Sequence, residues 1–241
     1  MNIIKLNAID STNNFLKELS ATQILDNFTT VVTENQLKGK GQRGATWVSE
    51  DGKNLTFSTY IHHNPAFTNE LFTFNVMASI ALVKVLEKYQ LPQLHIKWPN
   101  DILSENKKIC GILIENTIKS DGRIHCIIGI GLNVNQMVFQ NLPKASSMVI
   151  LKNMVFDKEV LLNEILKSLK HHYNQLENPT LLWKKYHTYL YKKGIPVAFE
   201  NTSKEQFMGI IQGVSTFGKL MVLLENDTIH EYDIKEIKML Y

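Results

Sequence analysis

Residues 39–44 combine glycine with positive charge, in the order Gly-Lys-Gly-Gln-Arg-Gly. Glycine lets backbone N–H groups approach an anion closely, and Lys40 and Arg43 add positive charge. The spacing also matches the dinucleotide-binding pattern G-x-G-x-x-G, but that pattern needs a helix directly after the glycines. Here a strand pattern follows at 54–61. We therefore expect a loop that binds a phosphate-bearing substrate, with a solvated surface loop as the alternative.

A second candidate is the sequence from Lys97 to Asp101, which reads Lys-Trp-Pro-Asn-Asp. Pro99 cannot continue a strand, so we expect the preceding strand to end at Trp98 and a turn to form at Asn100 and Asp101. A tryptophan beside lysine, asparagine and aspartate also offers the apolar wall and polar groups typical of a ligand pocket. Asp101 is thus either a structural turn residue or part of a site.

Lys108 opens the third candidate, an apolar strand. Because side chains alternate along a strand, Lys108 should share a face with Cys110, Ile112 and Ile114. Lys107 should point to the other face and be solvated. A lysine among apolar neighbours needs an anionic partner. We expect the ligand to be that partner.

The elements that position these residues follow from apolar periodicity and capping residues. Ser11 and Thr12 are suited to cap a first helix. Further helices are expected at 71–89, 158–176 and 181–190. Strands are expected at 29–33, 54–61, 94–98, 108–117 and 124–134, with an Asp121-Gly122 hairpin turn before the last.

After Gly194 the sequence changes to short strand patterns separated by turn residues. These strands are expected at 195–200, 205–214, 219–224 and 228–233. We place a domain boundary near residue 191, between a larger domain at 1–190 and a β domain at 191–241. The expected fold class is α+β, with a mixed, mostly antiparallel sheet and flanking helices, followed by a small β-barrel.

The composition is that of an ordinary globular protein. The 241 residues carry a formal net charge of +3, too small by itself to indicate nucleic-acid binding. No secretory signal and no membrane-spanning stretch is visible in the sequence. Cys110 and Cys126 both lie in apolar runs and are expected to be buried, reduced thiols. The cytoplasm is therefore the expected compartment.

Five segments, in this order, resemble the motifs of the biotin–protein ligase family. They begin at Asp10, Gly39, Lys97, Lys108 and Gly129. In the same order, they resemble the family's D-S-T-N element, G-R-G-R-x-G loop, K-W-P-N-D sequence, K-x-x-G-I-L-x-E strand and G-x-G-x-N element. The resemblance extends from the first of them to the C-terminus. It implies a class II synthetase-like catalytic domain with an SH3-like C-terminal barrel, of the ligase-only kind without an N-terminal DNA-binding domain.

The resemblance also implies an activity and a set of site residues. The enzyme would join biotin to AMP, using ATP with Mg²⁺, and transfer biotin to a lysine of a biotin carboxyl-carrier protein, such as the carrier domain of acetyl-CoA carboxylase. The implied catalytic residues are Lys108, Arg43 and Asp101. The implied biotin-binding residues are Ser11, Thr12, Asn13, Gln36, Lys40, Gly41, Gln42 and Lys108. The implied ATP- and adenylate-binding residues are Gly39, Lys40, Gly41, Arg43, Trp47, Asn100 and Asn133.

The glycine-rich loop departs from the family pattern at two positions. Gln42 and Ala45 stand where the family often has arginine. In the family, the arginine at the fourth loop position helps to retain the activated intermediate. We expect Lys40 and Arg43 to carry more of the phosphate charge in this chain.

Three other functions compete with this interpretation. A lipoate–protein ligase would share the fold and the adenylation chemistry, but its loop typically reads R-R-x-S-G-G-G-x-V-x-H. A DNA-binding regulator is disfavoured by the modest charge and by the lack of a DNA-binding module ahead of the first motif. An SH3-like interaction protein would account only for the C-terminal segment. No protein metal site, DNA partner or membrane partner is expected, and both a monomer and a homodimer remain open.

Overall fold

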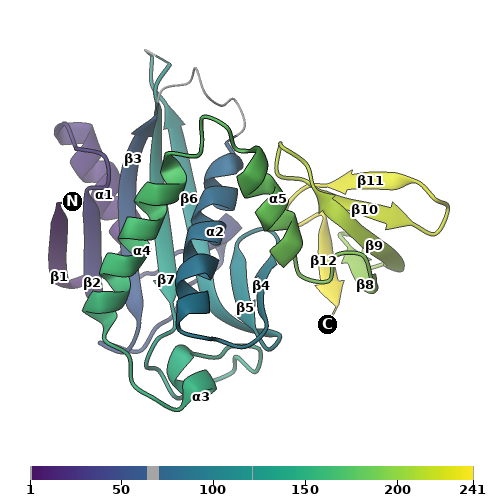
Figure 1. Ribbon diagram of the computed structural model, residues 1–241, viewed down its shortest axis with the longest axis horizontal. Helices are drawn as coiled ribbons and strands as arrows, with labels where there is room; N and C mark the ends of the chain where they lie inside the picture. The colour runs from purple at the N-terminus through teal and green to yellow at the C-terminus, as the bar shows by residue number, and fades with distance from the viewer. Residues whose placement is uncertain (1, 64–70, 121, 241) are drawn as a thin grey trace.

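The computed structural model describes residues 2–63, 71–120 and 122–240, except for the side chain of Arg43. The larger part contains, in chain order, β1 (Ile3–Ile9), α1 (Thr12–Thr22), β2 (Thr30–Gln36), the 3₁₀ turn η1 (Gln42–Gly44), β3 (Leu55–His63), α2 (Thr73–Lys88), β4 (Leu94–Lys97), β5 (Asp101–Ser104), β6 (Lys107–Ile118), β7 (Ile124–Leu132), α3 (Met148–Lys152), α4 (Lys158–Tyr173) and α5 (Thr180–Tyr189). The strands form one sheet, and the helices pack around it (Figure 1).

The large sheet has seven strands in the order β1-β2-β3-β7-β6-β5-β4. β1 and β2 run parallel, and the other neighbouring strands run antiparallel. The long strands β3, β6 and β7 lie side by side in its middle. The predicted class, α+β with a mixed and mostly antiparallel sheet, is confirmed.

The two faces of this sheet are covered differently. The helices α2, α4 and α5 pack over one face (Figure 1), where a large apolar cluster includes Phe57, Ile112 and Ile128. On the other face, α1 contacts β2, β3 and β7 over a small separate cluster that includes Leu16 and Ile127. Because side chains alternate along a strand, neighbouring residues of β7 serve the two clusters.

Several short elements differ from the prediction. β1, β5 and α3 were not expected, and Asp101, expected in a turn, is the first residue of β5, paired with Lys97 and Gly111. The turn is formed instead by residues 98–100. A signal for β1 was available, because apolar and polar residues alternate from Ile4 to Ala8. The predicted hairpin turn at Asp121 lies outside the described residues.

The C-terminal segment forms a second, five-stranded antiparallel sheet in the order β11-β10-β9-β8-β12. Its strands are β8 (Pro196–Asn201), β9 (Gln206–Val214), β10 (Leu220–Leu224), β11 (Ile229–Tyr232) and β12 (Ile237–Leu240). The last of these was not predicted. In the described residues the sheet stays open between β11 and β12, so the strand pairing does not confirm the expected closed barrel.

Direct contacts hold this second sheet against the larger part. The Trp98 indole N–H donates a hydrogen bond to the carbonyl of Gly218, at 2.8 Å. The backbone N–H of Val214 donates to Nε2 of His187, at 3.1 Å. These contacts place the C-terminal sheet beside β4 and α5 (Figure 1).

Two predictions about side-chain environment can be checked directly. Cys110 and Cys126 are both buried and neither forms a disulfide, as expected. Burial raises the pKa of each thiol, because a buried thiolate would lose its solvation. In the described part of the chain, no helix is long and apolar enough to cross a membrane.

Candidate active site

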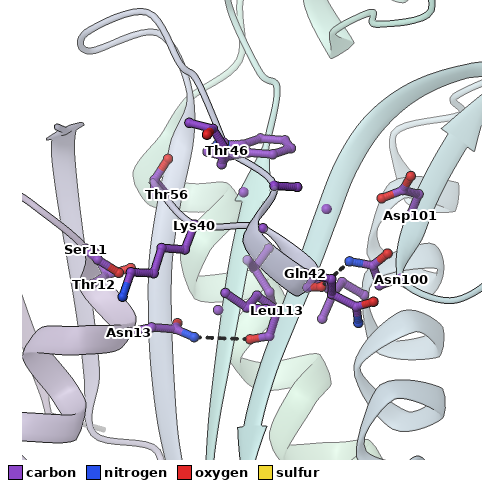
Figure 2. A pocket seen from close by; sticks show the side chains of 18 of the residues that line it. Ser11, Thr12, Asn13, Lys40, Gln42, Thr46, Thr56, Asn100, Asp101 and Leu113 are labelled. Carbon is purple, nitrogen blue, oxygen red and sulfur yellow. Dashed lines mark hydrogen bonds between the residues drawn. The ribbon is translucent and has the colours of Figure 1, made fainter. Parts of the chain in front are cut away.

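A cavity of about 280 Å³ lies on the sheet face next to α1. Figure 2 shows the start of α1 on one side of it, Asn100 and Asp101 on the other, and the glycine-rich loop with Lys40 and Gln42 between them. The predicted site residues that line it are Ser11, Thr12, Asn13, Gln36, Lys40, Gly41, Gln42, Trp47, Asn100, Asp101 and Lys108. Segments far apart in sequence therefore meet at one site.

The floor of the cavity is made of glycine where the large sheet would otherwise present side chains. Gly111 of β6 and Gly131 of β7 face each other across the strand pair, and both lie under the indole of Trp47. A Cβ atom at Gly131 would lie 2.4 Å from the ring of Trp47 and one at Gly111 would lie 3.1 Å from it. The glycines thus let the tryptophan lie close to the sheet.

One end of the cavity is a network of uncharged polar groups. Ser11 caps α1 by accepting from the backbone N–H of Asn14, at 3.4 Å. The backbone N–H and hydroxyl of Thr12 lie 3.0 and 3.2 Å from Oε1 of Gln36. Asn13 follows in the first turn and is buried. The helix start thus presents hydroxyl and amide groups, which can match the donors and acceptors of a flat amide-like ring.

Lys108 lies on the cavity face, not on the apolar face that its position in the strand predicts. A β-bulge at Ile109 shifts the register of β6 against β5, so that Cys110 pairs with Ile102 and Lys108 pairs with Leu103. Ile109 and Cys110 are therefore both buried in the core. The prediction that Lys108 shares a face with Cys110 is wrong, because one extra residue reverses the alternation.

Lys108 also has a protein partner, contrary to the expectation that only a ligand would supply one. Its Nζ lies 2.6 Å from Oδ1 of Asp101 and 5.5 Å from the ring centre of Trp47. Both charged side chains are partly exposed to the cavity. Lys107 is exposed, as predicted. Lys108 is therefore held between a carboxylate and an aromatic ring, and its remaining donors can face an anion.

The glycine-rich loop lines the same cavity and forms a short turn. The backbone N–H of Trp47 donates to the carbonyl of Gly39, and that of Gly41 donates to the carbonyl of Ala45, at 2.9 and 2.7 Å. Nζ of Lys40 donates to Oδ1 of Asn14 in α1, at 3.1 Å. No α-helix follows the loop, in agreement with the exclusion of a dinucleotide-binding fold. The side chain of Arg43 lies outside the described residues.

Three remaining residues differ in their relation to the cavity. Asn100 lines it and its side chain donates to the carbonyl of Ile112, at 2.7 Å. Gly39 is buried at the base of the loop, and Asn133 is buried with its amide donating to the carbonyl of Ser146, at 3.0 Å. Neither residue is among those that line the cavity. The adenine-binding role of Asn133 stays a prediction.

Other lining residues were not singled out from the sequence. Thr56 lines the cavity, and the hydroxyl of Ser58 contacts Thr12 and Asn13. Thr56 and Ser58 alternate with the buried Leu55 and Phe57 in β3. This alternation could have predicted that one face of the strand is polar. Ile234, in the connection between β11 and β12, also lines the cavity, and nothing in its local sequence indicates this.

Comparison with known proteins points in one direction. Residues 6–135 match the model of the biotin/lipoate A/B protein ligase family. The bifunctional ligase/repressor BirA of Salmonella typhimurium is 30% identical over 95% of this chain and 71% of its own length. A biotin–[acetyl-CoA-carboxylase] ligase of Paracoccus denitrificans is 32% identical over 52% of this chain and 51% of its own length.

The solved structure of the biotin protein ligase from Aquifex aeolicus in complex with biotin and ATP superposes with a TM-score of 0.81. The two chains are 26% identical, and the match covers 99% of this chain and 98% of the other. The family model covers more than half of the sequence, including the polar end of the cavity, the glycine-rich loop and Lys108. The chain therefore belongs to the biotin/lipoate A/B protein ligase family.

Proposed function

We propose that this chain is a biotin–protein ligase, which uses ATP to form biotinyl-5′-AMP and then transfers biotin to a lysine of a carrier protein. The observation that carries the proposal is a single cavity with a polar end, a glycine-rich loop and a lysine–aspartate pair. Such a cavity can hold an amide-like ring at one end and a carboxylate beside a phosphate at the other. The similarity to a ligase solved with biotin and ATP supports the same conclusion.

The reaction has two steps that both place negative charge near Lys108. In the first, the biotin carboxylate oxygen bonds to the α-phosphorus of ATP, and pyrophosphate leaves. In the second, a neutral lysine amine bonds to the acyl carbon, AMP leaves, the nitrogen loses one proton, and an amide forms. A fixed cation beside the reacting oxygens stabilises both transition states. We propose Asp101, whose Oδ1 lies 2.6 Å from Nζ of Lys108, as the base or orienting group for the acceptor amine.

At the polar end, Ser11, Thr12, Asn13 and Gln36 are proposed to hold the ureido ring of biotin. This ring has two N–H donors and one carbonyl acceptor, which need partners of opposite kind when buried. The loop residues Lys40, Gly41 and Gln42, all of which line the cavity, are proposed to bind the carboxylate side of biotin.

For the nucleotide, we propose contacts from Gly39, Lys40, Gly41, Arg43, Trp47, Asn100 and Asn133. Trp47 lies beside Lys108 over the glycine floor, where it can cover a bound adenylate. Among the described residues, no group of three or more His, Cys, Asp or Glu side chains is arranged to hold a metal ion. We propose that Mg²⁺ enters with ATP, bound through the phosphates and without a protein site of its own.

We propose the biotin carboxyl-carrier protein, as in acetyl-CoA carboxylase, as the acceptor, and the cytoplasm as the place of action. The name of the Paracoccus denitrificans relative supports this acceptor. We also propose residues 1–190 as the catalytic domain and residues 191–241 as an SH3-like domain, supported by the five short antiparallel strands of the C-terminal sheet. The proposal needs no DNA or membrane partner and is compatible with a monomer or a homodimer.

The proposal is tested by incubating the purified chain with ATP, Mg²⁺, biotin and an isolated carrier domain. We expect one biotinyl group to be added to the carrier, detected by intact mass and by streptavidin binding. A carrier with its acceptor lysine changed to arginine serves as the control. Lipoate in place of biotin should give no product. Equal modification with lipoate, or no modification with biotin, would contradict the proposal.

A further inference from the structure

A chain of hydrogen bonds runs beneath the polar end of the cavity. Nδ2 of Asn13 donates to Oε2 of Glu115, at 2.8 Å, and to the carbonyl of Leu113, at 3.3 Å. Oδ1 of Asn13 lies 2.5 Å from the hydroxyl of Ser58, which lies 2.7 Å from the hydroxyl of Thr12. Figure 2 shows Asn13 directed from α1 towards Leu113 of β6. Three elements, α1, β3 and β6, are thus joined below the ligand site.

The carboxylate of Glu115, the nearer of two acceptors for the Asn13 NH₂ group, fixes the direction of this chain together with the carbonyl of Leu113. An ionised carboxylate only accepts hydrogen bonds, so the Asn13 amide must turn its NH₂ group towards Glu115 and its carbonyl towards Ser58. The single hydroxyl proton of Ser58 then serves the Asn13 carbonyl. The same hydroxyl is shared with the oxygen of Thr12, which lies 2.7 Å away and accepts from it.

The hydroxyl proton of Thr12 is therefore used within the protein. It is donated to Oε1 of Gln36, at 3.2 Å. A lone pair of the Thr12 oxygen stays available to the cavity. Because Oε1 of Gln36 also accepts from the backbone N–H of Thr12, at 3.0 Å, the Gln36 NH₂ group faces away, towards Gly39. The cavity thus presents an acceptor at Thr12.

The position of Asn13 is also fixed sterically. A Cβ atom at Gly129 of β7 would lie 2.2 Å from Oδ1 of Asn13, so the side chain fits there only because this residue is glycine. Asn13 is 3% exposed, and both of its amide hydrogens have partners. Glu115 is not among the residues that line the cavity, so it acts on a ligand only through Asn13.

We infer that Glu115 is a positioning residue that sets the hydrogen-bond polarity of the ureido-binding end. It orients Asn13, which orients Ser58 and makes the Thr12 hydroxyl an acceptor for a ligand N–H. This arrangement favours a ring that donates an N–H group, and it leaves the Thr12 acceptor unpaired opposite a ring without N–H. The inference rests on the proposed binding of biotin in this cavity.

The first test compares two substitutions at one position. Glu115→Gln keeps a carbonyl oxygen that can accept from Asn13 and should bind biotin within about threefold of the unchanged chain. Glu115→Met has a similar length but no acceptor, and it should weaken biotin binding about tenfold, as the loss of one net hydrogen bond would. The KM for biotin should rise in the same proportion, whereas the KM for ATP should stay unchanged. Glu18→Met, at an exposed position of α1, is the matched control and should behave like the unchanged chain.

The second test exchanges donor and acceptor. Asn13→Asp places a carboxylate against Glu115 and should weaken biotin binding more than Glu115→Met does. Adding Glu115→Gln to Asn13→Asp supplies an NH₂ group opposite the new carboxylate, so part of the binding should return. This comparison stays informative if Glu115→Met does not fold.

Unchanged biotin affinity in a folded Glu115→Met protein would overturn the inference, as would a double variant no better than Asn13→Asp alone. An equal loss of ATP and biotin affinity would also overturn it, since that indicates general damage to the fold. Failure of the unchanged chain to bind biotin would instead refute the proposed function, so the two failures are distinguishable.

Discussion

At the scale of single residues, Lys108 carries the strongest prediction. Lys108→Ala removes the cation that we propose lies beside the reacting oxygens. Adenylate formation should then fall about 10²–10³-fold, as it does when one oxyanion donor is removed from an enzyme. The fold should persist, because the pair with Asp101 is partly exposed and such pairs contribute at most about 1 kcal/mol. Pyrophosphate release and the melting temperature measure the two effects. Lys107→Ala is the control, and equal damage from both variants would refute the role.

The residue scale also shows where sequence reasoning succeeded and where it failed. The motifs identified Lys108 and Asp101 separately, and the structure brings them within 2.6 Å of each other. The face of Lys108 was predicted wrongly because the bulge at Ile109 depends on the pairing of β6 with β5. A bulge is a property of two strands, and the apolar pattern of one strand does not contain it.

At the scale of elements, the packing of Trp47 on β6 and β7 makes Gly131 a sensitive position. Gly131→Ala places a methyl group 2.4 Å from the indole, so the ring and the loop that carries it must move. Adenylate formation should fall at least about tenfold, equivalent to about 1.4 kcal/mol. If the effect acts through Trp47, Gly131→Ala should add little to Trp47→Ala in a double-mutant cycle. Additive losses would contradict this reading of the contact.

The loop at 36–46 should respond to ligands as a unit. Its residues Lys38, Lys40 and Gly44–Thr46 are exposed, and Leu37, its one large apolar side chain, is 63% exposed. The loop buries little apolar surface to offset the entropy lost when it becomes ordered. We therefore expect it to open readily without ligand. Amide hydrogen exchange should slow across these residues when biotin and ATP are added together. Exchange that stays unchanged there would count against the loop as a cover for the adenylate.

The elements themselves could be predicted to different degrees. The helix α2 and the strands β6 and β7 lie close to their expected ranges, because long apolar patterns leave little ambiguity. The short strand β5 was missed, because its four residues, which begin with Asp101, show no clear alternation of apolar and polar side chains. Its existence depends on pairing with β4 and β6.

At the scale of the whole molecule, the C-terminal segment contributes to the cavity. Ile234, between β11 and β12, lines the cavity, which also includes Pro99 and Asn100 of the larger part. The tail was predicted as a separate β module, and its strands largely agree with that prediction. Its contribution to the cavity was not predictable, because it depends on how the two sheets dock through Trp98 and Gly218.

The stability of the whole chain should decrease on mild acidification. Burial lowers the pKa of His63, His95, His172 and His187 below the usual value of 6.5. As the pH falls below about 6.5, the unfolded chain binds protons at these positions before the folded chain does. The unfolded state then holds more protons, so the free energy of unfolding falls as the pH falls towards the folded-state pKa values, below which the loss is complete.

Melting temperatures measured between about pH 7.5 and 5.5 should therefore fall with pH, in a range where carboxyl groups of ordinary pKa stay ionised. His187→Gln should make this fall shallower, because its side-chain oxygen can still accept from the backbone N–H of Val214 but cannot take up a proton. A melting temperature that is constant or rises on acidification would contradict the argument. So would an unchanged slope in His187→Gln, since that position would then not contribute to the proton linkage.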